Sequence, residues 1–229
     1  MNPLNALAGL FGYEFRRRRA GFDLYQYLDR DGAFDYERYR RVQTEGNRKK
    51  LANVWVLEEN VRFLADFIQR TVGDVRFGIC HGTRRGEEQK WFREQLGAEV
   101  IGTEISDTAT QFPNTIQWDF HEVKPEWIDA VDFIYSNSLD HSYDPRACLD
   151  AWMRCVRPGG VCIIEHTARH EHATQLDPFG ASVVQMPYLI LTWGEGRYHV
   201  TRILDAPAKR GAYTQFLVVQ RATHEETNG

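Results

Sequence analysis

Two acidic residues follow short apolar runs in the middle of the chain, at positions where a nucleoside could be bound. Glu104 lies near the end of run 99–105, and Asp119 lies with Phe120 at the end of run 115–120. A carboxylate at the first position can accept hydrogen bonds from both hydroxyls of a ribose. A carboxylate at the second could accept an adenine amino proton while the aromatic ring covers the base. Each feature alone also fits a structural role, as a strand-end acid or a helix N-cap.

A glycine-bearing turn at 81–86 precedes both acids. Gly78 in the preceding run and Gly82 and Gly86 in the turn differ in spacing from the GxGxxG pattern of dinucleotide-binding loops. Glycine lets a backbone approach a ligand closely, and the helix after such a turn offers unpaired N–H groups. The turn therefore fits a nucleotide site, although a plain structural connection explains it equally well.

Two groups of histidines could act on a substrate. His141 follows an apolar run and could serve as a general base, cap the helix that begins near Asp144, or support its own loop. The sequence EHTARHEH at 165–172 follows another run and offers a base, a substrate anchor or metal ligands. His166 is the best placed of its three histidines. Because no third fixed ligand accompanies them, we expect no metal.

The scaffold that would gather these side chains is an alternation of strands and helices. The apolar runs are separated by stretches of helical spacing, among them 87–96 and 146–156. This alternation predicts βαβ units and a parallel sheet covered on both faces, in which ligands bind at the carboxyl ends of the strands. The candidate residues cluster at such ends, because the expected strands are 75–80, 99–105, 115–120, 131–138 and 160–167.

The remaining segments extend this sheet. Runs 198–204 and 213–220 predict an antiparallel hairpin at the sheet edge and bring the strands to seven. Residues 180–193 have the spacing of a buried helix, with a strand as the alternative. Residues 34–70 predict two helices, the second with an apolar stripe for packing on the sheet: Val56, Leu57, Val61, Leu64 and Ile68.

The predicted fold is thus a doubly wound, mostly parallel α/β sheet with an edge hairpin. We expect the sheet domain at 73–221, an N-terminal helical lid at 1–72 and a flexible tail at 222–229.

One face of the first lid helix is polar. Tyr39, Gln43 and Asn47 recur every four residues and therefore share that face, next to the basic residues 48–50. If the helix folds over the sheet, the face could contact a cofactor or an anionic acceptor; a solvated stripe is the alternative.

Composition narrows the function classes. The 229 residues carry a net charge of −4, and 42% of them are hydrophobic. No apolar run reaches the roughly 20 residues of a membrane span. The acidic balance argues against a nucleic-acid partner. Residues 1–50, however, carry 11 Arg or Lys against 7 Asp or Glu, a net of +4 that favours an anionic partner near the lid.

Basic and cysteine residues bear on partners and location. The run Arg16–Arg19 could meet a phosphate-bearing substrate, solvent, or a partner subunit in a homodimer. The cysteines include no CxxC pair and fall on apolar segments, which predicts reduced thiols in a cytoplasmic protein; they are Cys80, Cys148, Cys155 and Cys162.

The central part of the chain resembles the class I S-adenosylmethionine-dependent methyltransferases, of the methyltransferase-11 type. The most specific stretch is SNSLDHSYDPRACLDAWMRCVRPGG at 136–160. It is similar to the family's fourth strand, Leu-acid-His step, Asp-Pro, Leu-bearing helix and Pro-Gly-Gly. The resemblance covers about 150 residues, 75–221. It implies the Rossmann-like methyltransferase fold and S-adenosylmethionine as cofactor.

The resemblance also implies a role for matching residues along the cofactor. It implies that Gly82 and Thr83 form a loop beneath the methionine moiety and that Glu104 binds the ribose hydroxyls. It implies further that Asp119 and Phe120 contact the adenine. Ser136 and Leu139 would line the methionine moiety and the methyl-transfer site.

The glycine loop departs from the family pattern. Where the family has acid-x-Gly-x-Gly-x-Gly, this chain has Gly78-Ile-Cys-His-Gly-Thr-Arg84. Cys80, at the family's first loop glycine, is therefore expected to contact the cofactor, and Cys80 and His81 must pack where the usual loop is bare. Arg84 or Arg85 could instead bind the cofactor carboxylate, which a guanidinium fork suits.

The leading hypothesis is methyl transfer from S-adenosylmethionine to an oxygen or nitrogen of a small-molecule or glycan-precursor acceptor, with an anionic acceptor favoured by the basic lid. His141 and His166 are the candidate bases. One alternative is a methyltransferase-like binding or scaffold subunit without catalysis. Another is a different nucleotide-cofactor enzyme such as a dehydrogenase, against which the missing GxGxxG counts.

Overall fold

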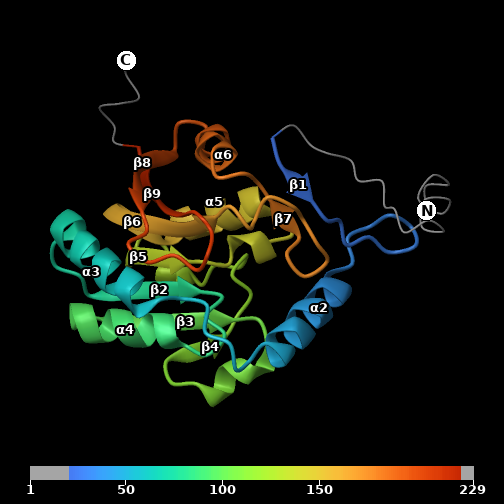
Figure 1. Ribbon diagram of the computed structural model, residues 1–229, viewed down its shortest axis with the longest axis horizontal. Helices are drawn as coiled ribbons and strands as arrows, with labels where there is room; N and C mark the ends of the chain where they lie inside the picture. Colours follow the sequence, from blue (N-terminus) through green and yellow to red (C-terminus); the bar gives the residue numbers. More distant parts are fainter. Residues whose placement is uncertain (1–20, 223–229) are drawn as a thin grey trace.

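A seven-stranded sheet forms the centre of the protein. The computed structural model describes residues 21–222. The strands lie in the order β4-β3-β2-β5-β6-β9-β8 (Figure 1). Their bounds are β2 (Phe77–His81), β3 (Glu99–Glu104), β4 (Thr115–Gln117), β5 (Val131–Ser136), β6 (Val156–Thr167), β8 (Tyr198–Asp205) and β9 (Thr214–Arg221).

The first five strands of the sheet are parallel, and β9 and β8 complete it as an antiparallel hairpin at its edge. The chain runs outward from β2 through β3 to β4, and then crosses back to β5 beside β2. The strand order therefore reverses between β2 and β5. At such a point a crevice opens at the carboxyl ends of the strands. The predicted fold class is confirmed.

Five helices and a small ribbon surround the sheet. The helices are α2 (Tyr36–Lys49), α3 (Glu58–Val72), α4 (Glu87–Leu96), α5 (Pro145–Cys155) and α6 (Gln185–Gly194), with short 3-10 turns η1 (Asp107–Gln111), η2 (Pro125–Trp127) and η3 (Leu139–His141). The ribbon pairs β1 (Asp23–Leu24) with β7 (Phe179–Gly180). None of the described helices is long and apolar enough to cross a membrane.

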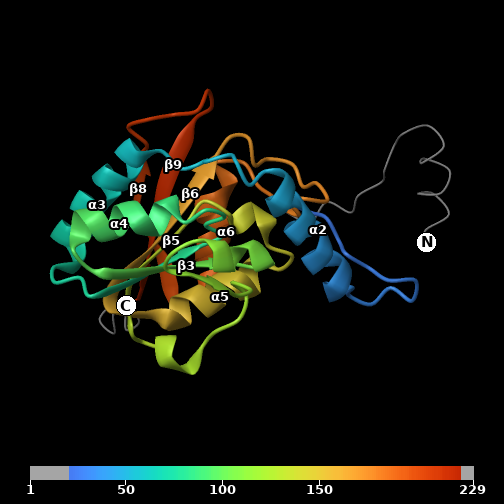
Figure 2. The same cartoon turned by 90° about the horizontal axis from the view of Figure 1, so that it is seen from below.

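Helices cover both faces of the sheet (Figures 1 and 2). One face packs against α3 and α4, and the other against α5 and α6. Successive residues of a strand point to opposite faces, so Ile134 joins one core while its neighbours Phe133 and Tyr135 join the other. The predicted stripe of α3 is buried on the sheet, with Val61, Leu64 and Ile68 fully inaccessible.

Local sequence signals set the helix bounds near the site. Gly86 and Gly97, both in the left-handed region, flank α4, which is typical of glycine at a helix end. Asp144 caps α5, accepting the backbone N–H of Ala147 at 3.0 Å, and Pro145 occupies its first position. Because Asp144 is the cap, His141 is free for another role.

Some boundaries differ from the predictions. The strand expected at 115–120 ends at Gln117, because the Asp119 side chain accepts the backbone N–H of His121 and turns the chain. The strand expected from 160 begins at Val156. The segment 180–193 is a helix only from Gln185, after the short strand β7.

Helix α2 lies across the carboxyl ends of the strands, apart from the layers on the sheet faces (Figure 2). At one end, Asn47 accepts a hydrogen bond from Thr108 of η1, at 2.8 Å. At the other, the Tyr39 hydroxyl donates to the backbone oxygen of His141, at 3.1 Å. The run Arg16–Arg19 and nearly all of the expected tail lie outside the described residues.

Candidate cofactor-binding site

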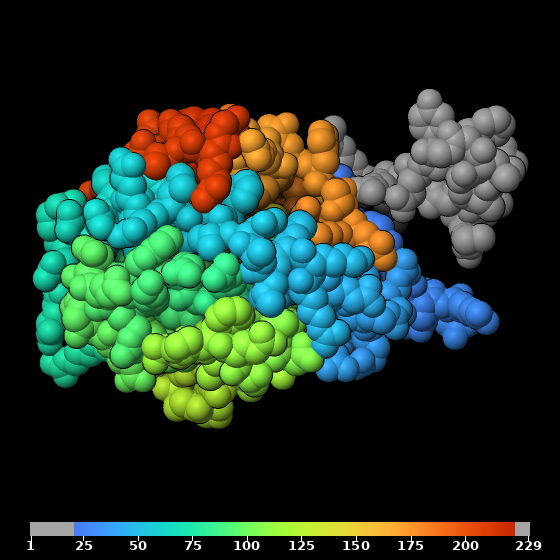
Figure 3. All heavy atoms as spheres, turned by 60° about the horizontal axis from the view of Figure 1, so that its bottom comes forward, coloured from blue at the N-terminus to red at the C-terminus, as the bar shows by residue number. Residues whose placement is uncertain are grey.

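Two adjoining hollows open where α2 crosses the strand ends. Figure 3 shows this side of the molecule, with α2 and the segment after it between the green and orange parts of the chain. With the open solvent at their mouths included, the first hollow spans about 550 Å³ and the second about 1580 Å³. Both are lined by Lys50, Gly82, Arg84, Ser138 and His141, so they form one continuous cleft.

The polar face of α2 forms the roof of the first hollow. Tyr39, Gln43 and Asn47 are all buried there. Gly46 lies on the same helix, and its lack of a side chain matters because a Cβ at this position would come within 2.3 Å of the Leu176 side chain. The glycine thus lets the segment after β6 close against the helix, and the predicted polar face points into the cleft.

Glu104 presents its carboxylate to the first hollow. One oxygen accepts the backbone N–H of Arg84 at 3.1 Å, and the other accepts that of Ser106 at 3.0 Å. Burial raises the pKa of the carboxyl group, and these hydrogen bonds oppose the rise. Each carboxylate oxygen can accept more than one hydrogen bond. The group is therefore held rigidly, with acceptor capacity left for vicinal hydroxyls.

Asp119 and Phe120 line the same hollow. One Asp119 oxygen lies 2.7 Å from Nδ1 of His121, and the other accepts the Tyr36 hydroxyl at 2.8 Å. Burial favours the neutral acid, but the hydrogen bonds and charge of His121 outweigh it and hold the pKa of Asp119 below its ordinary value. An ionised acceptor thus lies beside an aromatic ring, an arrangement that could accept an adenine amino proton and cover the base.

The glycine loop packs closely against the turn after β5. Gly82 has a φ of +74°, and a Cβ there would lie 2.5 Å from the Ser138 Cβ. The backbone N–H groups of Gly82 and Thr83 both donate to Thr103. Arg84, at the family's last loop glycine, has a φ of +43°. The loop keeps a left-handed backbone there without a glycine.

The substituted loop positions fill the space beneath the loop. Cys80 is fully buried against the α3 and α4 face and does not line the cleft. The His81 ring stacks on Trp152 with centroids 4.9 Å apart, and its Nδ1 lies 2.8 Å from the Thr103 hydroxyl. Burial lowers the pKa of His81 to about 3, so the ring is neutral.

Ser136 and Leu139 lie behind the cleft rather than on its surface. Ser136 is buried, and its hydroxyl donates to the backbone oxygen of His81 at 3.0 Å. Leu139 belongs to the hydrophobic core. Ser138, which the sequence did not single out, lines both hollows. Its signal was its place in the turn directly after β5, because ligands of such sheets bind at the carboxyl ends of the strands.

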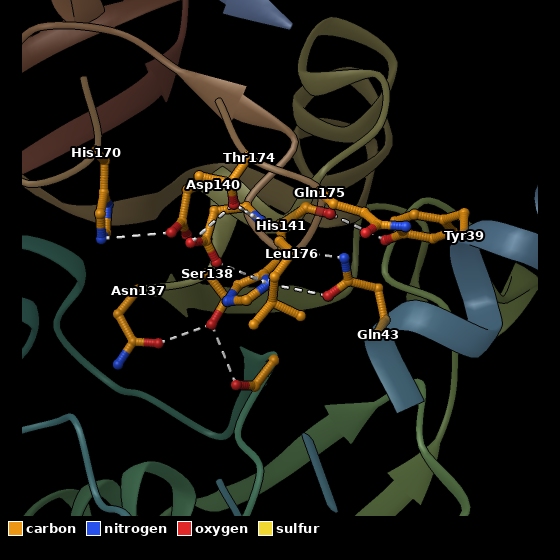
Figure 4. Close-up of polar contacts among 12 residues, drawn as sticks. Tyr39, Gln43, Asn137, Ser138, Asp140, His141, His170, Thr174, Gln175 and Leu176 are labelled. Atoms are coloured by element: carbon orange, nitrogen blue, oxygen red, sulfur yellow. Dashed lines mark hydrogen bonds and ion pairs between the residues drawn. The ribbon is translucent and has the colours of Figure 1, made fainter. Parts of the chain in front are cut away.

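The His141 ring is oriented by two oxygen acceptors (Figure 4). Its Nδ1 lies 2.9 Å from the Gln43 side-chain oxygen and 3.0 Å from the Leu176 backbone oxygen. Neither oxygen carries a proton, so Nδ1 must donate. Asp177 lies 3.7 Å from the same nitrogen. The neutral ring therefore leaves Nε2 unprotonated, on a side chain that lines both hollows.

The histidines at 166–172 do not gather into a metal site in the described part of the chain. Nε2 of His166 lies 2.9 Å from the Ala181 backbone oxygen, and burial lowers the pKa of this residue to about 4. His166 lines neither hollow. Within residues 21–222, the three side chains with ligand spacing are Asp140, His141 and Asp177. Nδ1 of His141 donates to Gln43 and Leu176, and Oδ1 of Asp140 has no hydrogen-bond partner among the described residues.

Glu88 is a buried acid that sequence inspection did not single out. It lines the second hollow and accepts a hydrogen bond from the Asn137 amide at 3.4 Å. Burial raises the pKa of Glu88 to about 8. In the sequence it is one of two consecutive glutamates in the first turn of a helix, where acids are common at exposed positions.

This buried acid gives a testable dependence of stability on pH. The unfolded chain releases the Glu88 proton near pH 4.5, whereas the folded protein keeps it until about pH 8. Between these values the folded state binds more protons, so stability falls as pH rises. Glu88→Gln removes this contribution. We expect its melting temperature to exceed that of the wild type by about 5 °C at pH 8.5 and to converge with it near pH 5.

The matched control is Glu94→Gln, on the exposed side of the same helix. Calorimetric melting curves of the three proteins between pH 5 and 8.5 measure the effect. A constant difference between Glu88→Gln and the wild type across this range would refute the titration of Glu88.

The fold and the cleft together define a class of protein, the α/β domains of the Rossmann-like methyltransferase fold. Residues 79–164 match the model of the family described as methyltransferase domain. This segment therefore resembles the methyltransferase domains, a class that takes S-adenosylmethionine as its methyl donor. The Glu104 carboxylate, with acceptor capacity facing the cleft, fits the ribose of that cofactor.

Solved structures of similar fold carry several activities. A 1,6-didemethyltoxoflavin N1-methyltransferase from Burkholderia thailandensis is 15% identical, with a TM-score of 0.65 over 90% of this chain and 98% of that one. The mitomycin 7-O-methyltransferase MmcR is 17% identical, with a TM-score of 0.54 over 76% and 54%. The [4+2]-cyclase SpnF is 11% identical, with a TM-score of 0.59 over 90% and 100%.

These identities show a shared fold and nothing finer. No curated protein matches the chain in sequence. Because structures of this fold include an N-methyltransferase, an O-methyltransferase and a cyclase, the reaction must be argued from the residues of the cleft.

Proposed function

We propose that the protein transfers the methyl group of S-adenosylmethionine to an oxygen or nitrogen of a small-molecule acceptor, with a glycan precursor as one candidate. The observation that carries this proposal is that Glu104, Asp119 and His141 come from three different strand ends and line one continuous cleft. Homodimerisation and a cytoplasmic location stay predictions from the sequence.

In this proposal the first hollow takes the adenosine part of the cofactor. Glu104 accepts the ribose hydroxyls, and Asp119 with Phe120 meets the adenine under the roof of α2. The second hollow takes the amino-acid end. There Arg84 and Arg85 offer guanidinium donors to a carboxylate, and the Glu88 side chain faces the ammonium group.

The proposed base is His141. S-adenosylmethionine, when bound, supplies an electrophilic methyl group on sulfur. Nε2 of His141 takes the proton from the acceptor hydroxyl or amine, while Nδ1 keeps its proton through Gln43 and Leu176. The nearby Asp177 carboxylate stabilises the positive ring that results. Burial beneath α2 keeps the reactants aligned, which an in-line displacement needs. His166 lacks this access, so we propose no base role for it.

Ligand-dependent melting tests the function. S-adenosylhomocysteine at about 100 times its Kd should add about 2.7 kcal/mol of stability and raise the melting temperature by about 5–10 °C. S-adenosylmethionine should act similarly, and NAD(P) should have no effect. A shift with NAD(P) alone would favour a dehydrogenase, and no shift with either adenosyl ligand would contradict the proposal. Binding without turnover on any acceptor would favour the scaffold alternative.

A further inference from the structure

Three loops that are distant in sequence meet at the outer wall of the second hollow. Trp55 lies between α2 and α3, Arg169 follows β6, and Arg210 lies between β8 and β9; all three line the hollow. Nε of Arg210 donates to the backbone oxygen of Trp55 at 2.7 Å. The guanidinium carbon of Arg169 lies 5.9 Å from the centroid of the Trp55 ring. The two arginines and the indole thus form one cluster.

Within residues 21–222, neither guanidinium group of this cluster is in a close ion pair. Arg48, Arg62 and Arg146 make ion pairs with carboxylates at 2.5 to 2.6 Å. Among the described residues, no ion pair at such distance joins Arg169 or Arg210 to a carboxylate. Their terminal guanidinium nitrogens have no hydrogen-bond acceptor in this part of the chain. Two guanidinium forks therefore face the hollow with donors to spare.

The acid that interacts with Arg210 through its charge is already engaged. Glu165 is buried, and burial raises its pKa. It accepts the Tyr135 hydroxyl at 2.7 Å. The hydrogen bond from Arg210 to the Trp55 backbone and the contact of Arg169 with the indole hold the wall together before any ligand arrives.

The wall shares its hollow with His141. A ligand anchored at the arginines can reach the free ring nitrogen without leaving the cleft. The basic residues 48–50 add less positive charge to this hollow than the two arginines do. Arg48 is paired with Asp107, and only Lys50 of the three lines the hollow.

We propose that Arg169 and Arg210 bind an anionic group of the methyl acceptor, a phosphate or a carboxylate, against the face of Trp55. This inference rests on the proposed function, and it specifies the substrate class. A guanidinium fork matches both anions through paired hydrogen bonds, and the indole covers the adjoining apolar part of the acceptor. The acceptor is thus held by its charged end, with its nucleophile towards His141.

Calorimetric titration of the protein saturated with S-adenosylhomocysteine tests the proposal. The probes are inorganic pyrophosphate and citrate, which distinguish phosphate from carboxylate recognition. We expect saturable binding of one anion per chain. The double variant R169A/R210A should weaken it at least about tenfold, and R169K/R210K should recover part of it. The matched control is R62A/R202A, which removes two exposed arginines elsewhere.

The outcomes separate the two proposals. Equal anion binding by R169A/R210A and R62A/R202A would mean an adventitious ion only and would overturn the inference. Failure of both anions to bind the wild type would overturn it too. Affinity for S-adenosylhomocysteine should be the same in all variants. If the wild type fails to bind S-adenosylhomocysteine, the proposed function fails, and the same anion titrations without it still test the wall.

Discussion

Replacement of Glu104 with glutamine is expected to weaken S-adenosylhomocysteine binding about 100-fold. The carboxylate is nearly buried and fixed by the N–H groups of Arg84 and Ser106. Two charge-assisted hydrogen bonds to ribose hydroxyls are worth about 1.5–3 kcal/mol each, and an amide makes them poorly because half of it is a donor. Isothermal titration calorimetry measures the change in Kd.

The matched control for this variant is Glu99→Gln. Glu99 begins the strand that Glu104 ends, and its side chain is exposed. The control should bind with wild-type affinity, and far-ultraviolet circular dichroism should show both variants folded. Equal Kd values for the two variants would remove Glu104 from the cofactor site.

Replacement of His141 with alanine is expected to lower kcat by about 10²–10⁴-fold, the usual contribution of a positioned base. Affinity for S-adenosylhomocysteine should change less than about threefold, because Glu104 and Asp119 hold the nucleoside elsewhere in the cleft. Initial rates of S-adenosylhomocysteine formation measure the effect, with an acceptor drawn from a screen of anionic metabolites. Added imidazole should restore part of the rate by occupying the vacated space.

Two further variants separate catalysis from structure. Gln43→Leu removes one of the two acceptors that orient Nδ1 of His141, and should lower kcat less than the alanine variant does. His172→Ala changes an exposed histidine and should leave the rate unchanged. If His141→Ala retains the wild-type rate, another group must take the proton.

The sheet was predictable because its signals are local. Helix α4 lies between two glycines, α5 begins at Asp-Pro, and each buried strand is a short apolar run. The errors occurred where side chains override such patterns. Asp119 bonds back to His121 and ends β4 early, and β6 extends back through Pro-Gly-Gly to Val156.

The convergence of Glu104, Asp119 and Phe120 on one cleft could be predicted from the sequence, whereas the surroundings of His141 could not. Glu104, Asp119 and Phe120 occupy successive strand ends, and the alternation of strands and helices brings such ends together. Cys80 was misplaced because its strand continues to His81, which turns the thiol into the core.

The acceptor side depends on contacts between distant segments. His141 is oriented by Gln43, 98 residues earlier, and by Leu176, 35 residues later. At the outer wall of the second hollow, Arg210 donates a hydrogen bond to Trp55, 155 residues earlier in the chain. No periodicity or spacing encodes such pairs, because they arise only when separate loops pack at the same edge of the sheet.

In our proposal this cleft binds S-adenosylmethionine with its ribose at Glu104 and its sulfur facing His141. A crystal structure of the complex with S-adenosylhomocysteine would show this arrangement. We expect the ribose hydroxyls within hydrogen-bond distance of the Glu104 carboxylate, the adenine beside Asp119 and Phe120, and the sulfur open towards His141. An adenosyl group bound outside the cleft, or a ribose turned away from Glu104, would contradict it.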